Sequence, residues 1–340
     1  MPCELGYTLH TFTTAAPTIM RILLAPMEGV IDHTMREMLT GLGGIDRCVT
    51  EFLRVSGQLL PPRVFHRICP ELHQGGLTRH GTPVFLQLLG GQPQVLAENA
   101  ARGAELGALG IDLNFGCPAK TVNRSDGGAI LLREPGRVHA ITAAVRRALP
   151  AATPLTVKVR LGFDDRSTFT DVIAAISDAG ASEIVIHART RRDGYRPPAY
   201  WEEIRRARSC TAISLVANGE IWSPDDAVRC REASGSSDLM LGRGALCRPD
   251  LPRLVRSVDS GDPLPPMTWT EVLPLLRHFF ELTLRGYDAR YAGNPLKQWL
   301  VYLRSYYPQG AVLFESIKRL HDPTAIRGHL DCADRQGIAA

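Results

Sequence analysis

Residues 155–188 read LTVKVRLGFDDRSTFTDVIAAISDAGASEIVIHA, and two different periods alternate within this stretch. The β-branched runs Leu155–Arg160 and Glu183–Ala188 predict strands, and Thr168–Ala179 between them predicts an amphipathic helix. Gly180 follows the helix at the position where a glycine cap is typical. The stretch therefore predicts a strand-helix-strand unit.

The same alternation continues in both directions along the chain. Six further apolar runs predict strands at Ile22–Pro26, Cys48–Phe52, Val84–Leu89, Gly110–Asn114, Leu215–Asn218 and Asp238–Gly242. Other stretches predict helices at Pro93–Leu106 (closed by Gly107), Pro135–Leu149 and Pro224–Ala233. Strand then helix, eight times over about 240 residues, is the period and length of a (β/α)8 TIM barrel. A doubly wound sheet also alternates, but no G-x-G-x-x-G motif follows the first strand, so the barrel is favoured.

The pattern changes after about Ser257. Residues 259–268 (DSGDPLPPMT) have the composition of a linker, and the sequence beyond them has helical period only. One apolar stripe of this region consists of Leu296, Trp299, Leu300 and Leu303. We therefore expect an α/β chain in which residues 20–258 form the barrel and residues 259–340 form a small all-helical domain. Residues 1–19 precede the patterned sequence and are expected to be a disordered extension or the result of a misassigned start.

The composition argues against several classes of protein. The 340 residues are 44% hydrophobic and 22% charged, as is usual for a globular chain. No apolar run reaches the roughly 18 residues of a membrane helix, and residues 1–19 lack the pattern of a signal peptide. The eight cysteines form no C-x-x-C pair, so we expect neither disulfides nor a metal site. A chain without disulfides is expected in the reducing cytoplasm. We also expect the protein to be a monomer. A net charge of +4 permits a nucleic-acid partner without predicting one.

Polar residues stand at the carboxyl end of every predicted strand, where TIM barrels carry their active sites. They are Pro26-Met27-Glu28, Glu51, Gln87, Asn114 with Cys117, Lys158 with Arg160, His187 with Arg189, Asn218-Gly219-Glu220 and Gly242-Arg243-Gly244. Any one of them alone would be read as a capping or solvated residue. Together they predict a polar cup lined by amides and cations.

The last two strand ends indicate a phosphate site. Loops after strands 7 and 8 of such barrels commonly bind phosphate with backbone N–H groups and a helix N-terminus. Asn218-Gly219-Glu220 and Gly242-Arg243-Gly244 supply glycines for close approach and an arginine that binds phosphate in a bidentate manner. The other interpretation is two tight turns in which the glycines only relieve strain.

Cys117 lies in the most informative segment, Ile111-Asp-Leu-Asn-Phe-Gly-Cys-Pro-Ala-Lys-Thr-Val, which Gly127-Gly128-Ala129 follows. A cysteine between Gly116 and Pro118, just after a strand, is held out of the core. Such a thiol acts either as a nucleophile, for which His187 is a candidate base, or as a general acid. The residues alone leave both roles open.

This segment resembles the signature of the tRNA-dihydrouridine synthase family. The resemblance extends over residues 21–320 and includes Ala25-Pro-Met-Glu-Gly, Gln87, Val157-Lys-Val-Arg, Ile186-His-Ala-Arg-Thr, Ala217-Asn-Gly-Glu and Leu241-Gly-Arg-Gly. Glu51-Phe-Leu-Arg, Phe65-His-Arg-Ile-Cys-Pro-Glu-Leu and Lys297-Gln-Trp-Leu-x-Tyr-Leu-Arg are similar to the bacterial C-type members, which reduce uridine 16 of the tRNA D-loop.

The resemblance implies an FMN-dependent enzyme that uses NADPH to reduce the C5–C6 double bond of a tRNA uridine. FMN would lie across the barrel mouth, with Pro26, Met27 and Glu28 against its ring and Gln87 and Lys158 at its polar edge. His187 would contact the tail of the flavin. The phosphate end would be held by Asn218, Gly219, Glu220, Gly242 and Arg243.

For the substrate, the resemblance implies that the flavin passes hydride to C6 of a flipped-out uracil. Asn114 would orient the base, and Cys117 would protonate C5 as the proton donor. The helical domain would grip the tRNA. Lys297 and Arg304 share one helix face opposite the apolar stripe, so they are the candidate RNA contacts.

Two other functions fit such a barrel. A flavin-dependent reductase of a free pyrimidine or an enone would share the phosphate site, but it would not need the helical domain. A non-catalytic RNA-binding protein would be expected to have lost the thiol or the flavin contacts, and both are present here.

Overall fold

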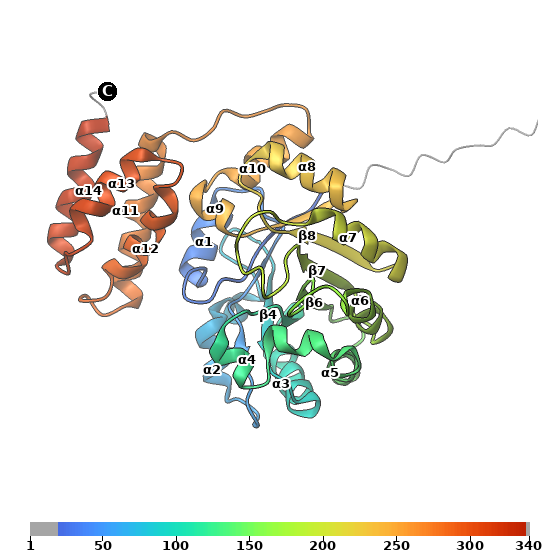
Figure 1. Cartoon of the computed structure of the whole chain (residues 1–340). Coiled ribbons are helices and arrows are strands. Elements are labelled where there is room, and N and C mark those ends of the chain that lie inside the picture. The colour runs from blue at the N-terminus through green and yellow to red at the C-terminus, as the bar shows by residue number, and fades with distance from the viewer. Residues whose placement is uncertain (1–19, 338–340) are drawn as a thin grey trace, which may run out of the picture.

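The computed structural model describes residues 20–337, and in that range eight parallel strands close into a barrel (Figure 1). The strands are β1 (Ile22–Leu24), β2 (Arg47–Val49), β4 (Val84–Leu89), β5 (Ile111–Phe115), β6 (Leu155–Arg160), β7 (Glu183–His187), β8 (Ser214–Asn218) and β9 (Asp238–Leu241). They pair in this order, and β1 pairs with β9 to complete the ring. The predicted TIM barrel is confirmed.

The second predicted strand, Cys48–Phe52, is two strands in the structure. β2 ends at Val49, and the short β3 (Leu53–Arg54) pairs in parallel with the far end of β4. The backbone N–H groups of Thr50 and Val55 still bond to Phe85 and Leu89 of β4. Phe52, which lies between the two strands, lines the cavity described below and is not part of the buried core.

The strands alternate between two environments. In β7, Ile184 and Ile186 pack against the surrounding helices, whereas Val185 belongs to a small apolar cluster inside the barrel. His187, two residues beyond Val185, therefore points into the barrel at the carboxyl ends of the strands. The same alternation directs Gln87, Asn114, Lys158 and Asn218 inward on their strands. The two-residue repeat of side-chain direction in a strand therefore brings the polar strand ends together inside the barrel.

Helices surround this barrel, as the sequence predicts. They are α1 (His33–Gly41), α2 (Pro62–Ile68), α3 (Pro93–Glu105), α4 (Lys120–Arg124), α5 (Pro135–Ala148), α6 (Phe169–Asp178), α7 (Trp201–Ala207), α8 (Pro224–Ser234), α9 (Arg243–Cys247) and α10 (Leu251–Asp259). Short 3-10 turns occupy Pro70–Gln74, Gly128–Arg133 and Arg208–Cys210. Gly107 and Gly180 follow α3 and α6 with φ of 94° and 85°, the left-handed conformation expected after a helix.

A helical bundle follows the barrel. Residues 260–268 form no regular element, and α11 (Trp269–Gly286), α12 (Gly293–Leu303), α13 (Pro308–Ile317) and α14 (Pro323–Gly337) come next. Within α12, the predicted stripe of Leu296, Trp299, Leu300 and Leu303 is buried, with no member more than 1% exposed. The bundle thus forms around the apolar face that the sequence indicates.

The bundle packs beside the carboxyl ends of the strands (Figure 1). The indole of Trp299 donates to the carbonyl of Leu246 in α9 at 3.1 Å. The Tyr287 hydroxyl donates to the Asp32 carboxylate at 3.0 Å, just before α1. These contacts place one helix of the bundle, α12, at the edge of the barrel mouth.

Two expectations concern other parts of the chain. The expected disorder of residues 1–19 lies outside the described residues. Within residues 20–337, none of the helices has the length and apolar character that crossing a membrane requires.

Candidate functional site

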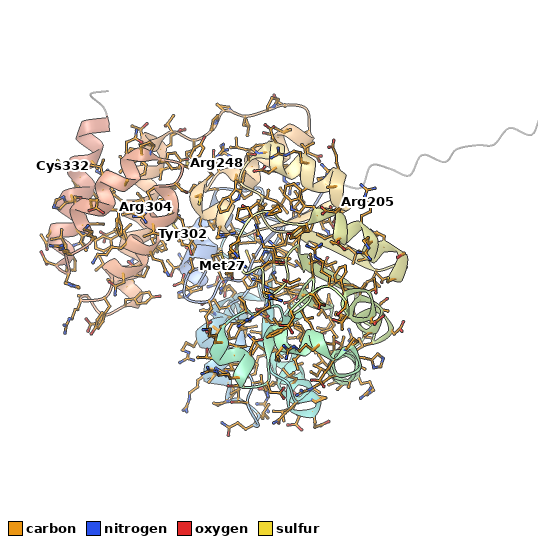
Figure 2. The ribbon with its side chains drawn as sticks, in the orientation of Figure 1. Met27, Arg205, Arg248, Tyr302, Arg304 and Cys332 are labelled. Atoms are coloured by element: carbon orange, nitrogen blue, oxygen red, sulfur yellow. The ribbon has the colours of Figure 1, made fainter. Side chains whose placement is uncertain are left out.

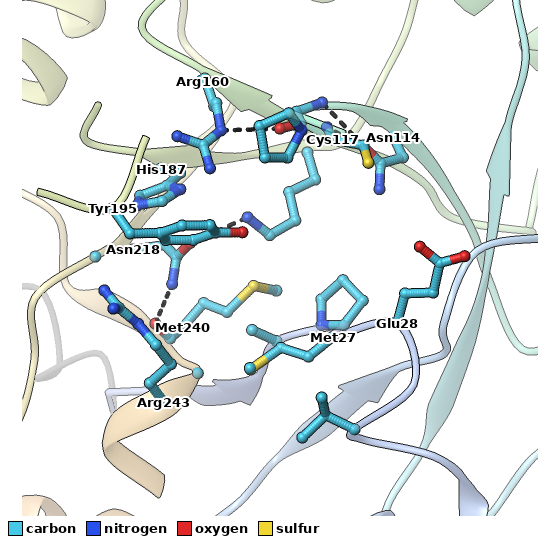
Figure 3. Close-up of a pocket in the computed structure, with 18 of the residues that line it drawn as sticks. Met27, Glu28, Asn114, Cys117, Arg160, His187, Tyr195, Asn218, Met240 and Arg243 are labelled. Carbon is cyan, nitrogen blue, oxygen red and sulfur yellow. Dashed lines mark hydrogen bonds between the residues drawn. The ribbon is translucent and has the colours of Figure 1, made fainter. Parts of the chain in front are cut away.

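A cavity of about 560 Å³ opens at the carboxyl ends of the strands (Figure 3). Every residue predicted to bind the cofactor lines it, and so do Asn114 and Cys117. These residues come from different strands, so the barrel itself brings them together. Cys117, Asn114 and Glu28 lie at one end of the cavity, and Arg243, His187 and Asn218 lie towards the other (Figure 3).

A chain of buried hydrogen bonds forms the cavity floor. Asn114 donates its amide to the Gln87 oxygen at 2.8 Å, and Gln87 donates to Asp112 at 2.7 Å. Thr156 also donates to Asp112, and burial raises the pKa of that carboxyl to about 6. The oxygen of Gln87 and one of its amide hydrogens are therefore engaged, which leaves the second hydrogen for a bound group.

Cys117 is held by its own loop. Asn114 accepts the backbone N–H groups of Gly116 and Cys117, both at 2.9 Å, and Asn123 donates to the Cys117 carbonyl at 3.0 Å. Gly128 has a φ of 71°, and a Cβ there would lie 2.9 Å from the Cys117 carbonyl oxygen, so only glycine fits. The thiol is thus fixed at a strand end and only partly buried.

The environment of Cys117 favours a protonated thiol. Burial raises its pKa, and the nearby Glu28 carboxylate acts in the same direction. His187, the candidate base, is buried, and burial together with Arg160 and Lys158 lowers its pKa well below the usual range. The two side chains share no hydrogen bond within the described residues. The geometry therefore favours a general acid over a base-activated nucleophile.

Lys158 is a partly buried cation, and within residues 20–337 no carboxylate lies within 4.0 Å of its ammonium. Its ammonium donates to the Asn218 oxygen at 3.0 Å, and Asn218 in turn donates to the Met240 carbonyl at 2.7 Å. Burial, with the neighbouring Arg160, lowers the pKa of Lys158 to about 8. A partly buried charge with one neutral partner favours an electron-rich ligand in the cavity.

Two glycine turns meet at the other end of the cavity. A Cβ on Gly219 would lie 2.9 Å from the His187 ring, and one on Gly244 would lie 2.1 Å from the Ile221 carbonyl oxygen. Arg243 stands between them with its guanidinium over the rings of Tyr195 and Trp222, at 5.0 and 4.9 Å. Packing against His187 and Ile221 therefore requires glycine at these two positions, and both glycines line the cavity.

The Glu220 side chain is already engaged. Its carboxylate pairs with the fully buried Arg189 guanidinium and accepts from the Trp222 indole at 3.0 Å. Arg243 lies 4.0 Å from the same carboxylate and is 30% exposed. Glu220 therefore neutralises Arg189, and Arg243 is the cation that this turn presents to the cavity.

The sequence motifs gave no role to several lining residues. Arg160 bonds to the Gly116 carbonyl at 2.9 Å and to the Gly194 carbonyl at 2.9 Å, so it ties the Cys117 loop to the loop after β7. The sequence placed Arg160 among the polar strand ends, without a role of its own. Tyr195 and Tyr302 also line the cavity, but they come from a loop and from the bundle, where no strand period points to them.

Lys297 and Arg304 do not line the cavity. The Lys297 ammonium donates to the Leu320 carbonyl at 2.5 Å, and the Arg304 guanidinium lies 5.1 Å from the centre of the Phe314 ring. Both therefore face the α13 side of α12, whereas Tyr302 lies on the side nearest the barrel (Figure 2). Their role as RNA contacts stays a prediction.

In the described part of the chain, no three His, Cys, Asp or Glu side chains cluster as metal ligands would.

Comparisons with known proteins agree with the motifs. A family model described as dihydrouridine synthase (Dus) matches residues 23–333. The tRNA-dihydrouridine(16) synthase of Aquipseudomonas alcaligenes is 50% identical over 303 residues, which are 89% of this chain and 96% of that protein. The protein of the same name from Pseudomonas syringae pv. tomato is 49% identical, with 93% and 100% covered, respectively.

Similarity to a solved structure extends only to the fold. Histamine dehydrogenase from Rhizobium sp. 4-9 superposes with a TM-score of 0.54 at 14% sequence identity. The match covers 71% of this chain and 46% of that one. It supports the barrel architecture independently of the sequence motifs.

Proposed function

The chain belongs to the dihydrouridine synthase family, and we propose that it is a tRNA-dihydrouridine(16) synthase, an oxidoreductase that reduces the C5–C6 double bond of uridine 16 in tRNA. Relatives with that name share about half of its residues over nearly their whole length. The observation that carries the proposal is Cys117, a fixed thiol at one end of a cavity whose other end is cationic and rich in glycine. With tRNA as its partner, we place the enzyme in the cytoplasm.

We further propose FMN as the cofactor, because the residues present fit it. Arg243 and the turns at Gly219 and Gly244, all of which line the cavity, suit a phosphate, and Lys158 suits the electron-rich edge of the ring system. Pro26 and Met27 would provide the apolar surface against the ring. Bound FMN, reduced by NADPH, would supply a hydride to C6 of the uracil.

Cys117 would complete the reduction by proton transfer. Addition of hydride at C6 leaves negative charge on the C4–C5 side of the base, and an acid within reach must neutralise it. The raised pKa keeps the thiol protonated at neutral pH, so it can donate to C5. Asn114 holds the Cys117 backbone in place, and Arg160 fixes the same loop from the β6 side.

An Arg243→Ala variant should lose FMN more readily during dialysis. The substitution removes a charge-assisted contact to the phosphate, while the stacked Tyr195 and Trp222 remain. Flavin absorbance per protein before and after dialysis measures the loss. Arg208→Ala, at an exposed arginine outside the cavity, is the matched control and should retain FMN like the parent. Equal retention by both variants would show that the phosphate binds elsewhere.

FMN binding should weaken as the pH rises above about 8. In the flavin-free protein the pKa of Lys158 is lowered to about 8, so its charge is lost above that pH. Because FMN would favour the charged form, its affinity should fall by up to roughly tenfold per pH unit, the limit for one linked proton. Fluorescence titrations from about pH 7 to about pH 10 measure the slope. Lys158→Met should abolish the slope, and Lys318→Met, at a surface lysine, should keep it; a slope unchanged in Lys158→Met contradicts the assignment.

The rival function is a flavin-dependent reductase of a free pyrimidine or an enone. Purified protein with flavin absorption bands can be reduced anaerobically with NADPH and then mixed with unmodified tRNA or with free uracil. We expect rapid flavin reoxidation with tRNA and little with uracil. Reoxidation by uracil alone would support the rival, and colourless protein that takes up no FMN would contradict both.

A further inference from the structure

A buried carboxylate inside the barrel takes no part in the chemistry described above. Asp112 lies on β5, two residues before Asn114, and is 1% exposed. In the sheet register it stands between Gln87 of β4 and Thr156 of β6, and both side chains donate to it, at 2.7 and 2.5 Å. Within residues 20–337, no Lys, Arg or His nitrogen lies within 4.0 Å of it. Burying a carboxylate without an ion-pair partner costs free energy, so Asp112 is a candidate for a functional role.

The hydrogen bonds that lead from Asp112 to Cys117 have a fixed direction. The backbone N–H groups of Gly116 and Cys117 can only donate, and both bond to the Asn114 oxygen at 2.9 Å (Figure 3). The Asn114 nitrogen therefore faces Gln87, and it donates to the Gln87 oxygen at 2.8 Å. This arrangement turns the Gln87 nitrogen towards Asp112. The far end of the chain of hydrogen bonds thus requires an acceptor.

An ionised carboxylate meets this requirement better than a neutral side chain, because both of its oxygens accept and neither donates. Burial raises the pKa of Asp112 to about 6, against the opposing effect of the Arg47 and Lys158 charges, so the carboxyl is ionised at neutral pH. A neutral amide in its place would keep its oxygen on the donating Thr156 hydroxyl and present its nitrogen to Gln87. The carboxylate therefore selects one of the two orientations of the Gln87 amide.

We propose that Asp112 is a positioning residue for the proton donor: it orients the amides of Gln87 and Asn114, and through them it holds the loop that carries Cys117. The inference rests on the proposed function, because the position of the thiol matters to turnover only if the thiol donates the proton. Asp112 acts through other residues, since it is not among the residues that line the cavity.

Backbone hydrogen exchange in the FMN-saturated enzyme tests the proposal at the loop itself. The variant is Asp112→Asn. The matched control is Thr156→Val, which removes a hydrogen bond to the same carboxylate and leaves that carboxylate as an acceptor. At about pH 7.5, where Asp112 is ionised, we expect the N–H groups of Gly116 and Cys117 to exchange roughly fivefold faster or more in Asp112→Asn, because the Asn114 oxygen no longer accepts them. Thr156→Val should match the parent.

Turnover separates positioning of the thiol from binding of the RNA. Asp112→Asn should lower the dihydrouridine formed in a single turnover by roughly ten- to 100-fold, the scale expected when a reacting group is displaced by about 1 Å. The KM for tRNA should stay near that of the parent, because Asp112 is buried and does not reach the surface. Thr156→Val should keep both quantities near the parent values.

A second substitution should restore the order of the loop. Gln87→Glu in the Asp112→Asn background places a carboxylate next to Asn114, where its oxygens accept from the amides on both sides. The Asn114 oxygen again faces the backbone N–H groups, so exchange at positions 116 and 117 should return towards the parent rate. FMN affinity is expected to fall, because Gln87 belongs to the proposed FMN site. General damage to the fold would not be recovered in this way.

Three results overturn the inference: parent-like exchange at positions 116 and 117 in Asp112→Asn, an equal loss of protection in Thr156→Val, or no recovery in the double variant. If Asp112→Asn does not fold, Asp112→Leu replaces it and should show the same loss, because its side chain accepts no hydrogen bond. A parent enzyme that forms no dihydrouridine overturns the proposed function instead and leaves the exchange result standing, so the two failures are distinct.

Discussion

Replacing Cys117 with alanine should lower uridine reduction by about 100-fold or more, the usual scale for a positioned acid, while the fold and FMN are retained. Alanine fits the loop, because Asn114 holds the backbone of residue 117 and not its side chain. Reduction of the flavin by NADPH should continue at the parent rate, because the thiol enters only when the uracil is protonated. Dihydrouridine formed per enzyme under single-turnover conditions measures the effect.

Cys210→Ala is the matched control for Cys117→Ala. Cys210 is also partly buried, but it does not line the cavity, so its loss should leave turnover unchanged. The pH profile separates the two roles of the thiol. A general acid with a raised pKa loses activity as the pH rises through that pKa, whereas a nucleophile gains activity there. Near-parent turnover of Cys117→Ala would remove the thiol from the mechanism.

Glu71→Ala should lower the free energy of unfolding by about 3–5 kcal/mol, because it leaves the Arg36 charge buried without its partner. Arg36 is fully buried and binds both Glu71 oxygens, at 2.8 and 2.9 Å. It also donates to the carbonyls of Ile31 and Ile68, so the pair fixes the loop after β1 and the end of α2. Urea denaturation measures the loss.

Two comparisons sharpen the Glu71 experiment. Glu98→Ala, at an exposed glutamate of α3, should change stability by no more than about 0.5 kcal/mol. Arg36→Met with Glu71→Leu removes both charges and should recover much of the loss. The pKa of Glu71 is lowered mainly by Arg36, against the opposing effect of burial, so its contribution is present above the ordinary glutamate pKa and fades as the pH falls through the lowered value. A parent-like Glu71→Ala would contradict the assigned role of the pair.

The barrel was predictable because each strand is a short apolar run with its own helix. The boundaries were predicted less well where backbone chemistry decides them. β1 stops at Leu24, and Pro26 after it has no N–H group to donate to a ladder. The run Cys48–Phe52 is split into β2 and β3, and Phe52 between these strands lines the cavity, a position that the run itself does not reveal.

The cavity residues that lie at strand ends could be predicted from the sequence. Gln87, Asn114, Lys158 and His187 occupy inward positions of parallel strands, so placing the strand ends also placed the residues. Tyr302 was not predictable, because its position depends on how α12 docks through Trp299 on α9.

Mapping dihydrouridine in tRNA from cells with and without this gene tests the central claim most directly. We expect position 16 to carry dihydrouridine when the gene is present and uridine when it is deleted, with restoration by the parent gene but not by Cys117→Ala. Dihydrouridine that persists at position 16 in the deletion strain, or that disappears only from another position, would contradict the account.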